Sequence, residues 1–181
     1  MDFRSAVFGA IAAIVAICAV VALYLAFGFY DIGADAPHLG LTRTVIEFAR
    51  NRSVAARVGD IKIPSLNEPQ RVADGAADYD AMCTSCHLAP GMAENEMRPG
   101  LYPKPPKLAA IPALPPAVQF WIIKHGIKMS GMSAWGKTHS DDEIWNMVAF
   151  LQKLPKLTPG EYKMLSGIGR HDHDGHMNMD H

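Results

Sequence analysis

A long apolar stretch dominates the start of the chain. Residues 5–30 carry no charged side chain, and 25 helical residues span about 37 Å, more than the ~30 Å of a bilayer core requires. Arg4 precedes the stretch and Asp31 and Asp35 follow it, an order that leaves the N-terminus inside the cell. The pattern therefore predicts one transmembrane helix within residues 1–36, with the remainder of the chain outside the cytoplasm.

A cleaved signal peptide is the alternative interpretation of this stretch. Ala34-Asp35-Ala36 resembles a small-x-small cleavage site. The apolar run is longer than the ~7–15 residues of a signal peptide, however, and Pro37 would directly follow the cut. Cys18 follows Ile17, where a lipid-attachment signal requires a small residue. We therefore expect an uncleaved, single-pass anchor without a lipid.

The next segment alternates apolar and basic positions at helical spacing. Residues 42–58 predict a helix whose polar side carries four arginines: Arg43, Arg50, Arg52 and Arg57. Such a helix suits lipid headgroups beside the anchor, and it equally suits a neighbouring subunit. The pattern leaves both possibilities open.

Three further helices are predicted, and no strand pattern occurs. One begins at Pro69 and runs to Met82, and another covers residues 116–125 and stops at Gly126. The last begins after Ser140, which forms a capping box with Glu143, and ends before Pro155. Residues 90–116 are rich in proline and glycine and predict an irregular loop. The domain should therefore be all-α.

Charge and cysteine content exclude several classes of protein. The 181 residues include 17 basic and 18 acidic side chains, which gives no sign of a nucleic-acid partner. Three cysteines cannot form a disulfide framework, and only Cys83 and Cys86 lie close enough in sequence to act together.

These two cysteines belong to the motif Cys83-Thr84-Ser85-Cys86-His87. The spacing places two thiols on one short turn, where they can add to the vinyl groups of a haem, with His87 as the adjacent iron ligand. A thioredoxin-like redox pair would need a βαβ context, and a zinc half-site would need a second pair of ligands. Neither context is present, so the motif predicts one covalently attached haem c.

With this motif, residues 67–162 resemble the class I cytochromes c, in particular the membrane-anchored bacterial type with one haem. The resemblance rests on the motif, on the segment 131–136, and on residues of the first and last helices: Gly75, Tyr79, Trp145, Phe150 and Leu151. It implies a small helical cytochrome c fold around the haem, and electron transfer as the function.

A methionine opposite the histidine is typical of electron-transfer haems because the thioether favours ferrous iron. Four loop methionines are candidates: Met92, Met97, Met129 and Met132. The segment 131–136 resembles the family's ligand loop, with Ser133 in place of the usual proline, so the resemblance assigns Met132, with Met129 as runner-up. It also implies that a proline carbonyl accepts the Nδ1–H of His87, and Pro90 is the candidate.

Two groups of side chains predict further contacts. Five lysines should surround the haem edge and could steer an acidic redox partner, or could simply keep the surface soluble: Lys104, Lys107, Lys124, Lys128 and Lys137. The C-terminal tail contains imidazoles and thioethers that suit copper: His171, His173, His176, Met177, Met179 and His181. The alternative for the tail is a polar segment with adventitious metal affinity.

Together these patterns predict four parts: an anchor (1–36), a juxtamembrane basic helix and linker (37–66), a cytochrome c domain (67–165) and a His/Met-rich tail (166–181). We expect an electron carrier rather than an enzyme, in the bacterial inner membrane with its haem domain in the periplasm. It would serve a respiratory oxidoreductase or oxidase, either free or as a subunit. The alternatives are a haem-based catalyst or gas sensor, and a copper-handling protein.

Overall fold

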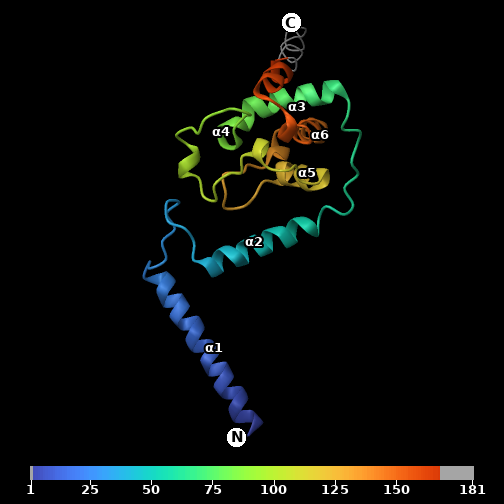
Figure 1. Cartoon of the computed structure of the whole chain (residues 1–181). Coiled ribbons are helices and arrows are strands. Elements are labelled where there is room, and N and C mark those ends of the chain that lie inside the picture. The colour runs from blue at the N-terminus through green and yellow to red at the C-terminus, as the bar shows by residue number, and fades with distance from the viewer. Residues whose placement is uncertain (1, 168–181) are drawn as a thin grey trace. The chain divides into compact units, whose positions relative to one another are not determined.

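The computed structural model describes residues 2–167, and all regular structure in this range is helical (Figure 1). The chain divides into two units, one ending at Ala36 and the other beginning at Pro37. The prediction of an all-α fold is confirmed. The main helices are α1 (Phe3–Ala26), α2 (Gly40–Ala55), α3 (Pro69–Met82), α4 (Thr84–His87), α5 (Pro116–His125) and α6 (Asp141–Leu151).

The first unit consists of α1 and the residues that follow it. This helix has 24 residues, none of them buried, and by length and composition it can cross a membrane. The predicted apolar helix is therefore present. A signal sequence near an N-terminus would satisfy the same criteria.

The core of the second unit lies between α3 and α6, which make the most extensive contact between helices in the described chain. Tyr79 of α3 and Phe150 of α6 are fully buried, with ring centroids 5.3 Å apart. The helices approach most closely at Gly75, where an added Cβ would lie 1.9 Å from the carbonyl oxygen of Asn146. Glycine is required here because any side chain would meet the backbone of α6.

Helix α5 joins this pair through aromatic stacking. The rings of Phe120 and Trp145 lie 4.2 Å apart between centroids, at an interplanar angle of 14°. Gly126 ends the helix with a φ of 64°, a conformation that glycine adopts without steric cost. The predicted bounds of α3 and α5 are confirmed.

The start of α6 is also as predicted. The backbone N–H of Glu143 donates to Ser140 Oγ at 3.3 Å, and the Glu143 carboxylate accepts from the Ser140 N–H at 2.7 Å. The acidic first turn of α6 lies at the positive end of the helix dipole. This capping box fixes where the loop before α6 ends.

Helix α2 ends at Ala55, three residues before the predicted end at residue 58. The guanidinium of Arg57 folds back and donates to the carbonyl oxygen of Ser53 at 2.8 Å. Such a bond satisfies a carbonyl that the last helical turn leaves without a backbone donor.

A final helical segment, residues 159–167, was not predicted. Its start is a second capping box: Glu161 N–H donates to Thr158 Oγ1 at 3.3 Å, and Thr158 N–H donates to the Glu161 carboxylate at 2.8 Å. Tyr162 from this segment is 4% exposed, and its hydroxyl donates to Asp80 Oδ1 at 2.6 Å. The segment therefore closes the core over the C-terminal end of α3.

Candidate functional site

The Cys-x-x-Cys-His motif lies at the junction of α3 and α4. Cys83 is the residue between the two helices, and its carbonyl accepts the N–H groups of Cys86 at 3.1 Å and His87 at 2.8 Å. Both thiols and the imidazole are thus carried by a single turn of backbone. Leu88 ends this turn with a φ of 60°, and its carbonyl accepts from the buried Tyr79 hydroxyl at 2.7 Å.

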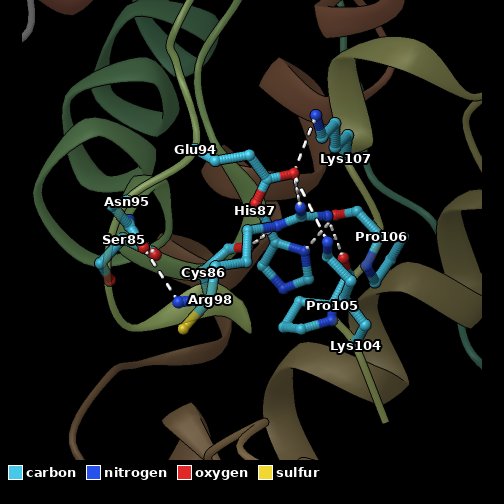
Figure 2. Close-up of polar contacts among 10 residues, drawn as sticks. All are labelled: Ser85, Cys86, His87, Glu94, Asn95, Arg98, Lys104, Pro105, Pro106 and Lys107. Carbon is cyan, nitrogen blue, oxygen red and sulfur yellow. Dashed lines mark hydrogen bonds and ion pairs between the residues drawn. The ribbon is translucent and has the colours of Figure 1, made fainter. Parts of the chain in front are cut away.

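The imidazole of His87 has a defined orientation. Its Nδ1 lies 2.9 Å from the carbonyl oxygen of Pro106 (Figure 2). Because a carbonyl oxygen only accepts, Nδ1 carries the proton, and the lone pair at Nε2 remains for a metal. Burial lowers the pKa of His87, which favours the neutral ring that coordination requires.

The expected acceptor, Pro90, was wrong. The left-handed Leu88 turns the chain away from the imidazole, and Gly91 lies against Pro159, to which an added Cβ would approach within 3.0 Å. The loop then returns to His87 some fifteen residues later, where Pro106 supplies the carbonyl.

Met132 lies in the loop between α5 and α6. Its backbone is held by Ile127 N–H, which donates to the Met132 carbonyl at 3.1 Å, and by Ser130 Oγ, which accepts from the Met132 N–H at 3.2 Å. The side chain is partly buried and packs against the same apolar core as Cys83 and Trp135. Met132 and the turn formed by residues 83–87 (the attachment turn) therefore border one core.

The other candidate methionines are more open to solvent. Met129 is 96% exposed and adopts a φ of 56°. Met92 and Met97 are 44% and 48% exposed. An exposed thioether gains little from an apolar cofactor face, so burial favours Met132 over its competitors.

The donor set suits a covalently attached haem. Cys83 and Cys86 are not joined by a disulfide. Burial raises the pKa of the Cys83 thiol to about 12, so the free thiol is protonated at neutral pH. Within residues 2–167 no group of three or more His, Cys, Asp or Glu side chains is placed to hold a metal ion. The six candidate copper ligands of the tail lie outside the described residues.

Arg98 is a component of this site that the sequence did not reveal. It is 3% exposed, and its Nε donates to the Cys86 carbonyl at 3.0 Å. Its two Nη atoms donate to Glu94 and to the Pro105 carbonyl (Figure 2). An arginine within a loop rich in glycine and proline is ordinarily exposed, and no periodicity marks this one as buried.

Three cationic side chains lie within ion-pair distance of the Glu94 carboxylate, close to the attachment turn. Besides Arg98, its Oε1 lies 3.0 Å from Lys107 Nζ and 3.6 Å from Lys104 Nζ. The hydrogen bond from Arg98 is the largest cause that lowers the pKa of Glu94 to about 2, followed by that from Lys107. This carboxylate is therefore ionised at any physiological pH.

The five lysines do not form a uniform patch of unpaired cations. Lys104 and Lys107 pair with Glu94, and Lys124 pairs with Asp141 at 2.6 Å. Lys128 and Lys137 are exposed, and neither forms an ion pair with any residue in the described range. These two lysines flank the Met132 loop and are the members of the five that remain available to a partner.

Comparison with known protein families finds a match. Residues 70–151 match the family described as cytochrome C oxidase, cbb3-type, subunit III. The matched range extends from α3 to α6 and includes the attachment turn, Arg98 and the Met132 loop. No curated protein and no solved structure matches the chain.

Proposed function

Because residues 70–151 form a cytochrome c domain of the cbb3-type oxidase subunit III family, we propose that the protein is a membrane-anchored carrier of single electrons with one haem c. Membership of this family implies electron transfer and a covalent haem. The anchoring, the ligand set and the partner belong to the proposal. The observation that carries it is the orientation of His87 by Pro106, which leaves Nε2 as the only available ring nitrogen beside two thiols.

The residues of the attachment turn would hold the haem in a fixed position. Cys83 and Cys86 would form thioether bonds, and His87 would bind the iron through Nε2. The bound haem supplies a one-electron change between ferric and ferrous iron. The Nδ1–H donated to Pro106 increases the basicity of the imidazole and fixes its plane.

Met132 would supply the second protein ligand of the iron. Its thioether favours the ferrous state and raises the reduction potential. The backbone bonds from Ile127 and to Ser130 hold the loop in place, so little rearrangement would accompany a change of oxidation state. If His87 and Met132 both hold the iron, no open position would remain for a substrate, as expected of a carrier rather than a catalyst or gas sensor.

Helix α1 would tether this domain to the bacterial inner membrane. Cytochrome c domains of this kind typically lie outside the cytoplasm, and the charges that flank α1 favour the same orientation. An uncleaved α1 would confine the carrier to the membrane surface, next to membrane-bound respiratory partners. The family match supports an oxidase as the partner, and Lys128 and Lys137 suit one with an acidic docking surface.

The experiment that tests the proposal is an optical spectrum of the full-length protein in its membrane. The oxidised wild type should show the weak near-infrared charge-transfer band of methionine-ligated ferric haem and should bind carbon monoxide slowly when reduced. Met132→Ala should lose the band and bind carbon monoxide rapidly. Met129→Ala, which truncates a fully exposed side chain of the same type, is the matched control and should behave as the wild type.

Two results would contradict the proposal. A wild-type protein without covalently bound haem would refute the central claim. A haem that binds carbon monoxide rapidly in the wild type would instead indicate a catalyst or sensor.

A further inference from the structure

The attachment turn α4 is too short to satisfy its own carbonyl groups, because the last turn of any helix leaves its carbonyls without intrahelical donors. The Thr84 carbonyl accepts from Leu88 N–H at 3.0 Å. The next two carbonyls accept from side chains of the following loop: Ser85 from Asn95 Nδ2 at 2.6 Å, and Cys86 from Arg98 Nε at 3.0 Å. The loop therefore caps the turn with two side chains.

Arg98 also reaches a second segment. One of its Nη atoms donates to the carbonyl of Pro105, and the neighbouring carbonyl, that of Pro106, accepts the Nδ1–H of His87 (Figure 2). Two consecutive carbonyls thus have different partners: that of Pro105 binds Arg98, and that of Pro106 binds the imidazole of His87. Arg98 is the side chain that joins the attachment turn to the backbone that orients its histidine.

The sequence of this segment makes such a link necessary. Pro105 and Pro106 have no backbone N–H, so neither can tie the segment to its surroundings through an amide donor. Their carbonyls are the only backbone polar groups that remain for this purpose.

The guanidinium group suits this task because it is planar and presents donors in several fixed directions. Its burial requires a counter-charge, since an unpaired buried cation is strongly disfavoured. Glu94 supplies that charge. A lysine would keep the charge but could not donate to Cys86 and Pro105 in the same fixed geometry.

We propose that Arg98 is a positioning residue for the proximal iron ligand: it holds the Pro106 carbonyl against the imidazole of His87. The inference rests on the proposed function, in which His87 binds haem iron. Arg98 would thereby set how strongly the imidazole donates to the iron, and so influence the reduction potential without touching the haem.

The test uses the full-length, haem-loaded protein in detergent micelles, reduced to the diamagnetic ferrous state. Proton NMR measures how fast the Nδ1–H of His87 exchanges with solvent. Arg98→Lys should accelerate exchange about tenfold, the factor that corresponds to losing roughly one charge-assisted hydrogen bond. Its reduction potential should rise, because a less strongly oriented imidazole is less basic and stabilises ferric iron less. The charge is unchanged, so the shift cannot come from removing a cation.

Asn95→Ala provides the matched control. It removes the other side-chain bond to the same turn, at Ser85, without touching residues 105–106. Exchange of the His87 proton and the potential should stay at wild-type values in this variant. Arg98→Met, which removes the charge as well, should accelerate exchange at least as much as Arg98→Lys.

Two outcomes would overturn the inference. In one, both Arg98→Lys and Arg98→Met carry covalent haem, and the His87 proton exchanges at the wild-type rate in each. If Arg98→Lys also keeps the wild-type reduction potential, Arg98 only fills a buried position. In the other, Asn95→Ala accelerates exchange as much as Arg98→Lys, so that general loosening of the turn explains the effect. A wild-type protein without haem would refute the proposed function instead. If Arg98→Met does not fold, Arg98→Lys decides the question.

Discussion

Replacing Gly75 by alanine tests the close approach of α3 and α6 where the two helices cross. On an open helix surface this change would stabilise the protein by up to about 1 kcal/mol, because alanine has the higher helix propensity. Here the new Cβ would lie 1.9 Å from the Asn146 carbonyl oxygen, 2.3 Å from its carbonyl carbon and 2.8 Å from Met147 N. All three atoms are backbone, so no side-chain rotation relieves the clash.

The expected loss of stability follows from the distance by which α3 and α6 must move apart. Ordinary contact for a Cβ begins at 3.4 Å, so α3 and α6 must separate locally by about 1.5 Å. Overpacking of a core costs about 1–3 kcal/mol when side chains can adjust, and each ~100 Å³ of void opened beside the contact adds roughly 2.4 kcal/mol. We therefore expect Gly75→Ala to lower the free energy of unfolding by about 3–4 kcal/mol, despite the gain in propensity.

The assay is chemical unfolding of the full-length protein in detergent, followed by circular dichroism at a helix-sensitive wavelength. Gly160→Ala is the matched control, because its added Cβ meets nothing within 4 Å and its position is helical. We expect the control to be neutral or slightly stabilised. A Gly75→Ala variant with the unfolding midpoint of the wild type would refute the reasoning, because α3 and α6 could not then approach as closely as described.

Two further predictions concern charge. Glu94→Gln should lower the urea midpoint of unfolding at pH 7. The pKa of Glu94 falls from 4.5 to about 2 in the folded state. The stability that the ionised carboxylate contributes is therefore complete above about pH 4.5 and is lost as the pH falls toward 2. Urea midpoints at pH 7 and pH 3 should therefore differ less in the variant than in the wild type, and an equal pH dependence would contradict the pairing with Arg98, Lys107 and Lys104. Replacing both Lys128 and Lys137 by glutamine should slow electron transfer to an acidic acceptor protein several-fold at low salt, with the difference vanishing at high ionic strength. Stopped-flow absorbance measures this rate, and Lys163→Gln, a change of an exposed lysine on a different helical segment, should have little effect; equal slowing by both changes would exclude a localised docking surface.

Local sequence signals predicted the helices well. Pro69, Gly126 and the capping box at Ser140 act through the backbone of their own turn, so their consequences can be foreseen without tertiary contacts. The helix over residues 159–167, which was not predicted, carries the same kind of signal at Thr158 and Glu161.

The attachment motif was also apparent from the sequence, whereas its supports were not. Pro106 and Arg98 reach the motif only because a long loop returns to it. Neither spacing nor composition specifies where an irregular loop crosses its own starting point, since that path depends on side-chain contacts made in three dimensions. The choice of Pro90 failed for this reason.

The lysine-rich loops illustrate a related limit. The sequence predicted five lysines around the haem edge without distinguishing paired from unpaired cations, and three of them lie within ion-pair distance of a carboxylate. Whether a surface charge is available to a partner depends on its neighbours in space, and the sequence alone does not specify them.

The position of Met132 also affects the mechanical behaviour of the domain. A bond from its sulfur to the iron would join residues 87 and 132, closing a loop of about 45 residues. Loop-closure entropy assigns a permanent cross-link of this length about 4 kcal/mol. A thioether holds ferrous iron more tightly than ferric iron. Reduction would therefore strengthen the bond that closes this loop, and oxidation would weaken it. The reduced carrier would then resist unfolding more strongly than the oxidised carrier.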